Sequence, residues 1–304
     1  MDRSHTPEPG TPTLDQLRVF ATVVEAGSFS AAARKLNRAQ SAVSYAIANL
    51  EELLGLALFE RGHHRPLLTE AGRAVLADAR HVGRLVDEMR ARASGLHAGL
   101  EAEVGLAVDV MFPTARLVAV LEAFARHFPT VALRLRIEAM GGVVQLVLDR
   151  VCGLGISWPM GLRSEVMEQQ PLCQIELVPV CAPTHPLALL PAPLTGSALQ
   201  EHVQLVLTDR SQLTEGQDFG VISPRTWRLG DLGAKHALLR AGLGWGNMPA
   251  HMVCDDLGGG RLVRLDQGRP GILFQLLLIH RVDRPPGPAT RWLAERLAEP
   301  PEVG

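Results

Sequence analysis

Apolar residues recur at helical spacing through the first hundred positions and predict three short helices followed by a long one. Leu17, Phe20 and Val24 mark the first helix, which Gly27 ends. The second lies over the alanine-rich segment AAARKL, for which Ser30 is the expected N-cap. Together with a third helix, these segments predict a small helical domain at the start of the chain.

The third predicted helix, QSAVSYAIANLE at positions 40–51, has an apolar side and an unusual polar side. Instead of lysines and glutamates, the polar side carries Ser41, Ser44, Tyr45 and Asn49. Such a face is either a weakly polar surface or a helix that enters the DNA major groove, where hydroxyl groups address base edges. A tight turn before the helix is typical of a helix-turn-helix.

A hairpin is predicted next, with residues 58–61 going out and 66–68 coming back. The following helix has apolar residues spaced alternately by four and three positions: Val75, Ala79, Val82, Val86, Met89 and Ala93. This heptad pattern over residues 70–95 favours pairing with a second copy of the chain.

From residue 103 onward, strand and helix signals alternate. The order β-α-β-α-β occurs once after Glu103 and begins again near Glu176, which predicts parallel sheets covered by helices. We therefore expect two linked α/β lobes, lobe I over residues 103–172 and 270–304 and lobe II over residues 173–269.

Composition limits the classes of function. With 304 residues, 47% hydrophobic residues and a net charge of -2, the chain is expected to be a soluble protein of two or three domains, and any nucleic-acid binding must be local. Residues 1–13 form a polar, proline-rich and flexible tail without a signal peptide, and no apolar run is long enough to cross a membrane. We therefore expect a cytoplasmic protein.

The four cysteines are Cys152, Cys173, Cys181 and Cys254, and they lack the spacing of metal ligands. The segment CQIELVPVC is a predicted strand, which would hold its two cysteines beyond disulfide reach. We expect ordinary buried cysteines, with a thiol switch as the alternative.

At this point the sequence resembles the LysR-type transcriptional regulators. The resemblance is carried by GSFSAAA, QSAVS, LFER and LTEAG within residues 14–72, and more weakly by HPLA at His185 and AGLGWGNMP at Ala241. It implies a winged helix-turn-helix over residues 14–69, a dimerising linker helix over 70–95, and a two-lobed α/β effector domain of periplasmic-binding-protein type over 103–304. The implied partners are double-stranded promoter DNA, a small organic effector, and one or three further copies of the chain; RNA polymerase is a further candidate.

The resemblance also implies a DNA-binding surface. Its members would approach bases, the adjacent backbone or phosphates: Arg34, Arg38, Gln40, Ser41, Ser44 and Tyr45 on the helices, and Arg61, His63, His64 and Arg65 on the wing. The adjacent histidines have no third ligand in view, so neither a metal nor another cofactor is expected.

The effector cleft is expected between the lobes, where strand ends meet helix N-termini. Asp109 stands where relatives often use Ser or Thr, and it would repel a carboxylate unless it is paired with Arg225 or Arg228. Trp158, Trp227 and Trp245 near the cleft suggest an aromatic or flat ligand, although for each single tryptophan a packing role is the favoured alternative. The expected effector-binding residues are Asp109, Val110, Met111, Gly142, Ser157, Trp158, Thr208, Asp209, Trp227 and Asn247.

Two other classes of function fit the sequence less well. An enzyme would need a nucleophile with a base, or a cofactor motif, and neither is recognisable. A transport-type solute-binding protein shares the two lobes but not the DNA-binding segment. A thiol-responsive or constitutive regulator is the alternative within the same class.

Overall fold

The computed structural model of the chain describes residues 10–60, 65–159, 165–217 and 219–300. The chain divides into two compact units, Met1–Ser94 and Gly95–Gly304. No helix in the described ranges is long and apolar enough to cross a membrane.

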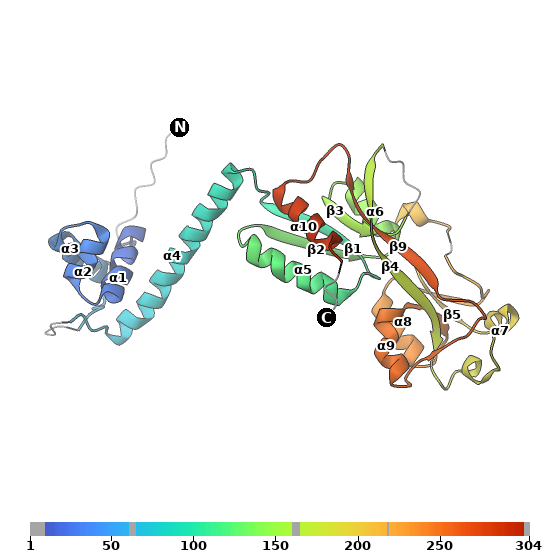
Figure 1. Cartoon of the computed structure of the whole chain (residues 1–304). Helices are drawn as coiled ribbons and strands as arrows, with labels where there is room; N and C mark the ends of the chain where they lie inside the picture. The colour runs from blue at the N-terminus through green and yellow to red at the C-terminus, as the bar shows by residue number, and fades with distance from the viewer. Residues whose placement is uncertain (1–9, 61–64, 160–164, 218, 301–304) are drawn as a thin grey trace. The chain divides into compact units, whose positions relative to one another are not determined.

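The first unit begins with three helices joined by tight turns: α1 (Leu14–Ala26), α2 (Phe29–Leu36) and α3 (Gln40–Leu54) (Figure 1). Gly27 and Asn37 end the first two helices in the left-handed conformation, with φ of 70° and 52°. Ser28, and not the expected Ser30, caps α2, because its hydroxyl group accepts a hydrogen bond from the backbone N–H of Ala31 at 3.1 Å. The turn at Gly27 is so short that α2 begins two residues earlier than the alanine run suggests.

The segment after α3 is fixed to that helix by Glu51. Its carboxylate accepts hydrogen bonds from the backbone N–H groups of Leu58 at 2.6 Å and Phe59 at 3.2 Å. The ring of Phe59 lies 5.5 Å from that of Phe20 in the core of the unit. The predicted hairpin is reduced to one antiparallel bridge between Phe59 and Leu68. Of its predicted tip at residues 62–65, residues 62–64 lie outside the described residues.

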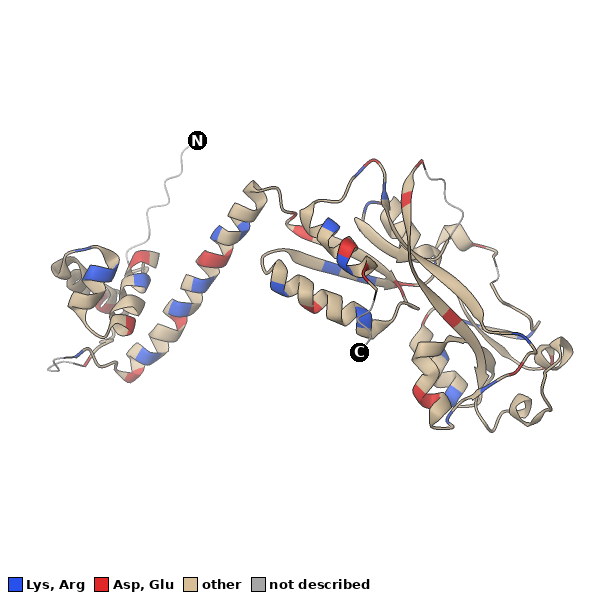
Figure 2. Cartoon of the chain, viewed as in Figure 1, with Lys and Arg blue, Asp and Glu red and all other residues tan. Residues whose placement is uncertain are grey.

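The long helix α4 (Glu70–His97) begins at Thr69, whose hydroxyl group accepts a hydrogen bond from the backbone N–H of Gly72 at 2.9 Å. Leu76 and Ala79 are buried against the core of the first unit. Farther along, apolar side chains on the predicted stripe become exposed, and Met89 is 60% exposed. Acidic and basic positions are interspersed along the rest of the helix (Figure 2).

The second unit contains one nine-stranded sheet whose two ends form the lobes. Lobe I comprises β1 (Glu103–Asp109), α5 (Thr114–His127), β2 (Ala132–Glu138), α6 (Gly141–Leu148), β3 (Leu154–Ser157) and α10 (Pro288–Ala298). Lobe II comprises α7 (Gly196–Gln200), β5 (Gln204–Leu207), β6 (Thr226–Leu229), α8 (Leu232–Arg240), β7 (Trp245–Pro249), α9 (Ala250–Gly258) and β8 (Val263–Arg264), with the short helices η1 (Pro186–Leu189) and η2 (Gln212–Thr214).

Two long strands join the lobes, β4 (Met167–Cys181) and β9 (Ile272–Arg281), and they run side by side (Figure 1). They are antiparallel to each other, with the register shifted between Pro171 and Cys173. β1 is parallel to β2 and β3, as expected, and β5 is parallel to β6 and β7. The sheet is therefore mixed and not wholly parallel, because the chain crosses from lobe I to lobe II and then returns.

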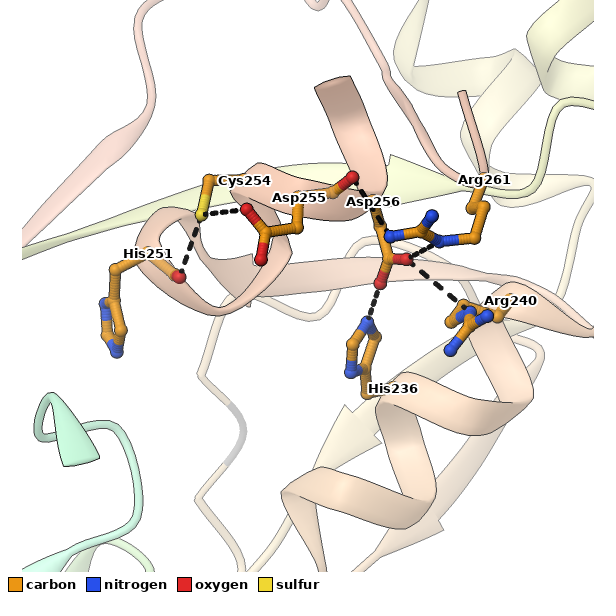
Figure 3. A network of polar contacts seen from close by, with 7 residues as sticks. All are labelled: His236, Arg240, His251, Cys254, Asp255, Asp256 and Arg261. Atoms are coloured by element: carbon orange, nitrogen blue, oxygen red, sulfur yellow. Dashed lines mark hydrogen bonds and ion pairs between the residues drawn. The ribbon is translucent and has the colours of Figure 1, made fainter. Parts of the chain in front are cut away.

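A polar network ties α8 to α9 in lobe II (Figure 3). The buried carboxylate of Asp256 accepts a hydrogen bond from Arg261, lies 2.6 Å from Nε2 of His236, and is 3.6 Å from Nε of Arg240. The hydrogen bond from Arg261 lowers the pKa of Asp256, so the carboxylate stays ionised.

The cysteines only partly follow the expectation of burial. Cys152 and Cys181 are buried and Cys173 is half-buried, whereas Cys254 is exposed on α9. Cys173 and Cys181 lie on the same strand, β4, as the sequence predicted.

Candidate functional site

The outward face of α3 is the first candidate site. Its predicted contact residues Gln40, Ser41, Ser44 and Tyr45 are all exposed, and Tyr45 is 73% exposed. The opposite side is buried through Val43, Ile47 and Leu50. The helix therefore presents short hydroxyl groups and one aromatic ring on a rigid support.

Basic side chains flank this face, and they differ in whether they form ion pairs with other residues. Arg34 is exposed and has no ion pair with any described residue. Arg38 donates two hydrogen bonds to the carboxylate of Asp15, at 2.7 and 2.8 Å, and these bonds lower the pKa of Asp15. Arg65 is exposed, while the other predicted wing residues, Arg61, His63 and His64, lie outside the described residues.

The second candidate site is a chamber of about 70 Å³ between the two lobes. The elements that meet there are the end of β1, the start of α6, the end of β3, strands β4, β5, β7 and β9, and the first turn of α8. Three of the predicted residues line it: Met111, Trp158 and Asn247. Most of the remaining lining is aliphatic or aromatic.

Aromatic rings form one wall of the chamber. The ring of Trp158 lies 4.5 Å from that of Phe219 in an edge-to-face arrangement and 5.5 Å from that of Phe274. The indole Nε1 of Trp158 is buried and has no hydrogen-bond partner among the described residues. A buried donor without a partner is costly, so this group favours a ligand that supplies an acceptor.

Lys235 is the only titratable side chain among the described residues that line the chamber. It is 5% exposed, and its ammonium group donates a hydrogen bond to the backbone carbonyl of Asn247 at 2.7 Å. Burial lowers the pKa of Lys235 to about 8, so the group is still mainly protonated at neutral pH.

Asp109 lies beside the chamber and is held by backbone groups. Its carboxylate accepts hydrogen bonds from the N–H of Met111 at 2.9 Å and from the N–H of Met140, just before α6, at 3.1 Å. Burial raises the pKa of Asp109 to about 7 against the effect of these bonds, and the charge of Asp209 adds to the rise. Met140 has a φ of 47°, and its N–H bond to Asp109 helps hold that strained conformation.

A polar hollow of about 580 Å³ adjoins the chamber and shares with it Met140, Val206, Leu207 and Phe219. The predicted residues Thr208 and Asp209 line this hollow. Thr214 donates a hydrogen bond to Oδ1 of Asp209, whereas Oδ2 is buried without a partner among the described residues.

The other predicted residues do not line either cavity. Ser157 is buried and donates a hydrogen bond to the carbonyl of Trp158, Val110 donates its N–H to the carbonyl of Glu138, and Gly142 packs against Glu138. Trp227 is 47% exposed on β6. Trp245 is a core residue whose Nε1 donates a hydrogen bond to the carbonyl of Leu199. A position near a strand end was not enough to direct these side chains into the cleft.

Sequence reasoning missed Lys235, Phe219 and Phe274. Phe219 lies in a loop and Phe274 on a long strand from the far end of the chain, so no local pattern connects them. For Lys235, the available signal was its rarity, since the chain has only one other lysine, Lys35.

Two family models match the chain, one in each of the two compact units. Residues 14–73 match the family described as bacterial regulatory helix-turn-helix protein, lysR family, and residues 97–300 match the LysR substrate binding domain. The chain belongs to the LysR family of transcriptional regulators.

Individual relatives agree over most of the chain. The HTH-type transcriptional regulator PunR of Escherichia coli (strain K12) is 30% identical over 288 residues, which cover 93% of this chain and 92% of that protein. The uncharacterized HTH-type transcriptional regulator YeeY of the same strain is 30% identical over 257 residues, covering 83% and 82%.

Solved structures share the fold. Full-length LysG of Corynebacterium glutamicum with its bound effector Arg has a TM-score of 0.51 at 20% identity and covers 94% of this chain and 97% of its own. An OxyR mutant from the same organism has a TM-score of 0.52 at 23% identity, covering 97% and 94%.

Proposed function

We propose that the protein recognises duplex DNA through the outward face of α3 and regulates transcription in response to a small molecule bound in the chamber between the lobes. The observation that carries the proposal is the exposed row of Gln40, Ser41, Ser44 and Tyr45 on a helix whose other side is buried. A short polar face of this kind can enter the major groove deeply. On the promoter, RNA polymerase is the further partner that we propose.

Arg34 and Arg38 have different roles in this proposal. Arg34, which has no partner in the described residues, is ready to neutralise a phosphate. Arg38 must first leave the carboxylate of Asp15, since both of its hydrogen bonds go there. We therefore expect Arg34 to contribute more to affinity than Arg38.

The test is selection of binding sequences from random duplex DNA by the full-length protein, followed by affinity measurements over a range of salt concentrations. Arg34→Ala should weaken binding to all duplexes and lower the salt slope by about 1, since one phosphate contact is lost. Ser44→Ala should instead reduce discrimination at particular base pairs, by about 1–3 kcal/mol for a lost base contact.

Arg126→Ala, at an exposed position on α5 in the second unit, is the matched control and should leave both properties unchanged. If Arg34→Ala and Ser44→Ala bind the selected DNA like the wild type, α3 is not the recognition helix and the proposal fails.

Pairing through α4 completes the proposal. Along its outer half, the side chains of Leu85 and Met89 are exposed and those of Val82 and Val86 are half-buried. Two copies paired there would bring two α3 helices to one DNA site, as a two-fold operator requires.

The cysteines do not favour the thiol-responsive alternative. Burial raises the pKa values of Cys152, Cys173 and Cys181, the last to about 11, so the reactive thiolate form is scarce at these positions. Cys254 is exposed, but its sulfur atom lies near the carbonyl of His251 and a carboxylate of Asp255, at 3.3 and 3.6 Å.

A further inference from the structure

The chamber contains a buried positive charge without a negative partner. Lys235 uses one of its three N–H donors on the carbonyl of Asn247, and no described carboxylate lies within ion-pair distance of it. Neither Asp nor Glu occurs among the described residues that line the chamber. Because a buried cation without a counter-ion is destabilising, the site is set up to receive an anion.

The neighbouring polar groups also favour a ligand that accepts hydrogen bonds. The amide oxygen of Gln204 already accepts hydrogen bonds from the N–H groups of Ile222 and Ser223, while its nitrogen donates one of its two N–H groups to the carbonyl of Gly220. The Nε1 donor of Trp158 has no partner among the described residues. A ligand that brings acceptor oxygens would therefore satisfy donors that the protein leaves unpaired.

Beside the start of α6, the cleft already contains negative charge from the protein itself. The carboxylate of Asp109 takes the N–H groups of Met111 and Met140, and Asp209 adds negative charge nearby. An anionic ligand is consequently excluded from that end of the cleft and directed toward α8.

We infer that the effector is a small aromatic monoanion, with its charged group at the ammonium group of Lys235 and its flat body against Trp158, Phe219 and Phe274. This inference rests on the proposed role of the chamber as the effector site and specifies the ligand class. The aromatic wall favours a planar ligand body.

Three probes of nearly equal shape test the charge: phenylacetate, phenylacetamide and 2-phenylethylammonium. Binding to the full-length protein is followed by calorimetry and by the shift in melting temperature at millimolar concentrations. We expect phenylacetate to bind about tenfold more tightly than the amide, since a hydrogen bond to a charged group is the stronger one, and the cation to bind least. Cyclohexylacetate, which keeps the charge but is not flat, should bind more weakly than phenylacetate.

The chain supplies a matched pair of variants because it has two lysines. Lys235→Met should abolish the preference for phenylacetate over phenylacetamide while keeping the apolar body of the ligand bound. Lys35→Met, at an exposed position on α2, should leave the preference unchanged.

A pH series on the wild type gives a second readout if Lys235→Met does not fold. Above about pH 8 the ammonium group loses its proton, so phenylacetate affinity should fall by up to about tenfold per pH unit while phenylacetamide affinity stays level. The other charged or titratable groups on β1, β4, β9 and α8 are Glu103, Asp109, Glu168, Cys173, Glu176, Cys181, His236, Arg240, His280 and Arg281, and Asp209, Arg228 and Asp231 lie on the adjoining segments.

Equal binding of the three probes, tighter binding of the cation, or a preference that survives Lys235→Met would overturn the inferred ligand class while leaving the chamber a binding site. Failure of all probes to bind would overturn the inference as well. DNA affinity, measured on the same preparations without probe, reports separately on the proposed DNA-binding function.

Discussion

At the scale of single residues, Asp109 couples the protonation state of the cleft to the stability of the protein. Its folded-state pKa of about 7 lies above its ordinary value of 3.8, so the folded protein retains a proton that the unfolded chain releases. The resulting stability is fully present below about pH 4 and is lost as the pH rises through about 7.

Asp109→Asn removes this linkage. Relative to the wild type, the variant should therefore gain unfolding free energy as the pH is raised from about 5 to about 8, by at most about 1.4 kcal/mol per pH unit. Melting temperatures of both proteins across this range measure the difference. Parallel curves for the two proteins would show that the group does not titrate there.

Sequence reasoning at this scale found the positions but often not the orientation of the side chains. Asp109, Met111 and Trp158 follow strand ends and lie at or beside the chamber, where parallel strands place such residues. Trp245 was expected at the cleft but is buried in lobe II. The burial of Lys235 depends on how α8 packs across β5 and β7, which the local sequence of the helix does not encode.

At the scale of elements, the first turn of α4 packs closely against the backbone of the segment that follows α3. A Cβ atom at Gly72 would lie 2.1 Å from the carbonyl oxygen of Leu58, which is backbone and cannot move aside. Gly72→Ala should destabilise the first unit by about 1–3 kcal/mol, as overpacking does, and weaken DNA binding through loss of the folded domain.

Gly83→Ala is the matched control on the same helix. A Cβ atom there would meet nothing within 4 Å, so the substitution should stabilise α4 by up to about 1 kcal/mol. Circular dichroism melts of the two variants distinguish these effects. A stable Gly72→Ala protein would contradict the described packing between α4 and Leu58.

Element types and order were largely predictable, because helical and strand periodicities are local. The three short helices and the long α4 follow the apolar spacing of the sequence, and the tight turns fall at Gly27 and Asn37. The antiparallel pairing of β4 and β9, the two strands that connect the lobes, was not predictable from periodicity. The direction in which distant strands pair depends on the path of the whole chain.

At the scale of the whole molecule, the exposed stripe of α4 determines the expected assembly. Met89→Glu places a charge at the centre of the stripe and should convert the proposed dimer to monomers, with a steep loss of affinity for a two-fold DNA site. Sedimentation velocity measures the first effect and DNA titration the second.

Ala91→Glu adds the same charge on the opposite side of the helix and should leave the assembly intact. A monomeric wild type, or equal effects of the two substitutions, would rule out pairing through this stripe.

The connection of the two lobes by β4 and β9 also limits which parts of such a protein can be exchanged by recombination during evolution. The first unit is one continuous stretch of chain, Met1–Ser94, so a single exchange of gene segments could replace it. Lobe II, in contrast, is inserted between two strands that both continue into lobe I. It cannot be exchanged without cutting both strands, so new ligand preferences should arise by substitution inside the lobes, whereas new DNA preferences can be acquired by replacing the first unit as a whole.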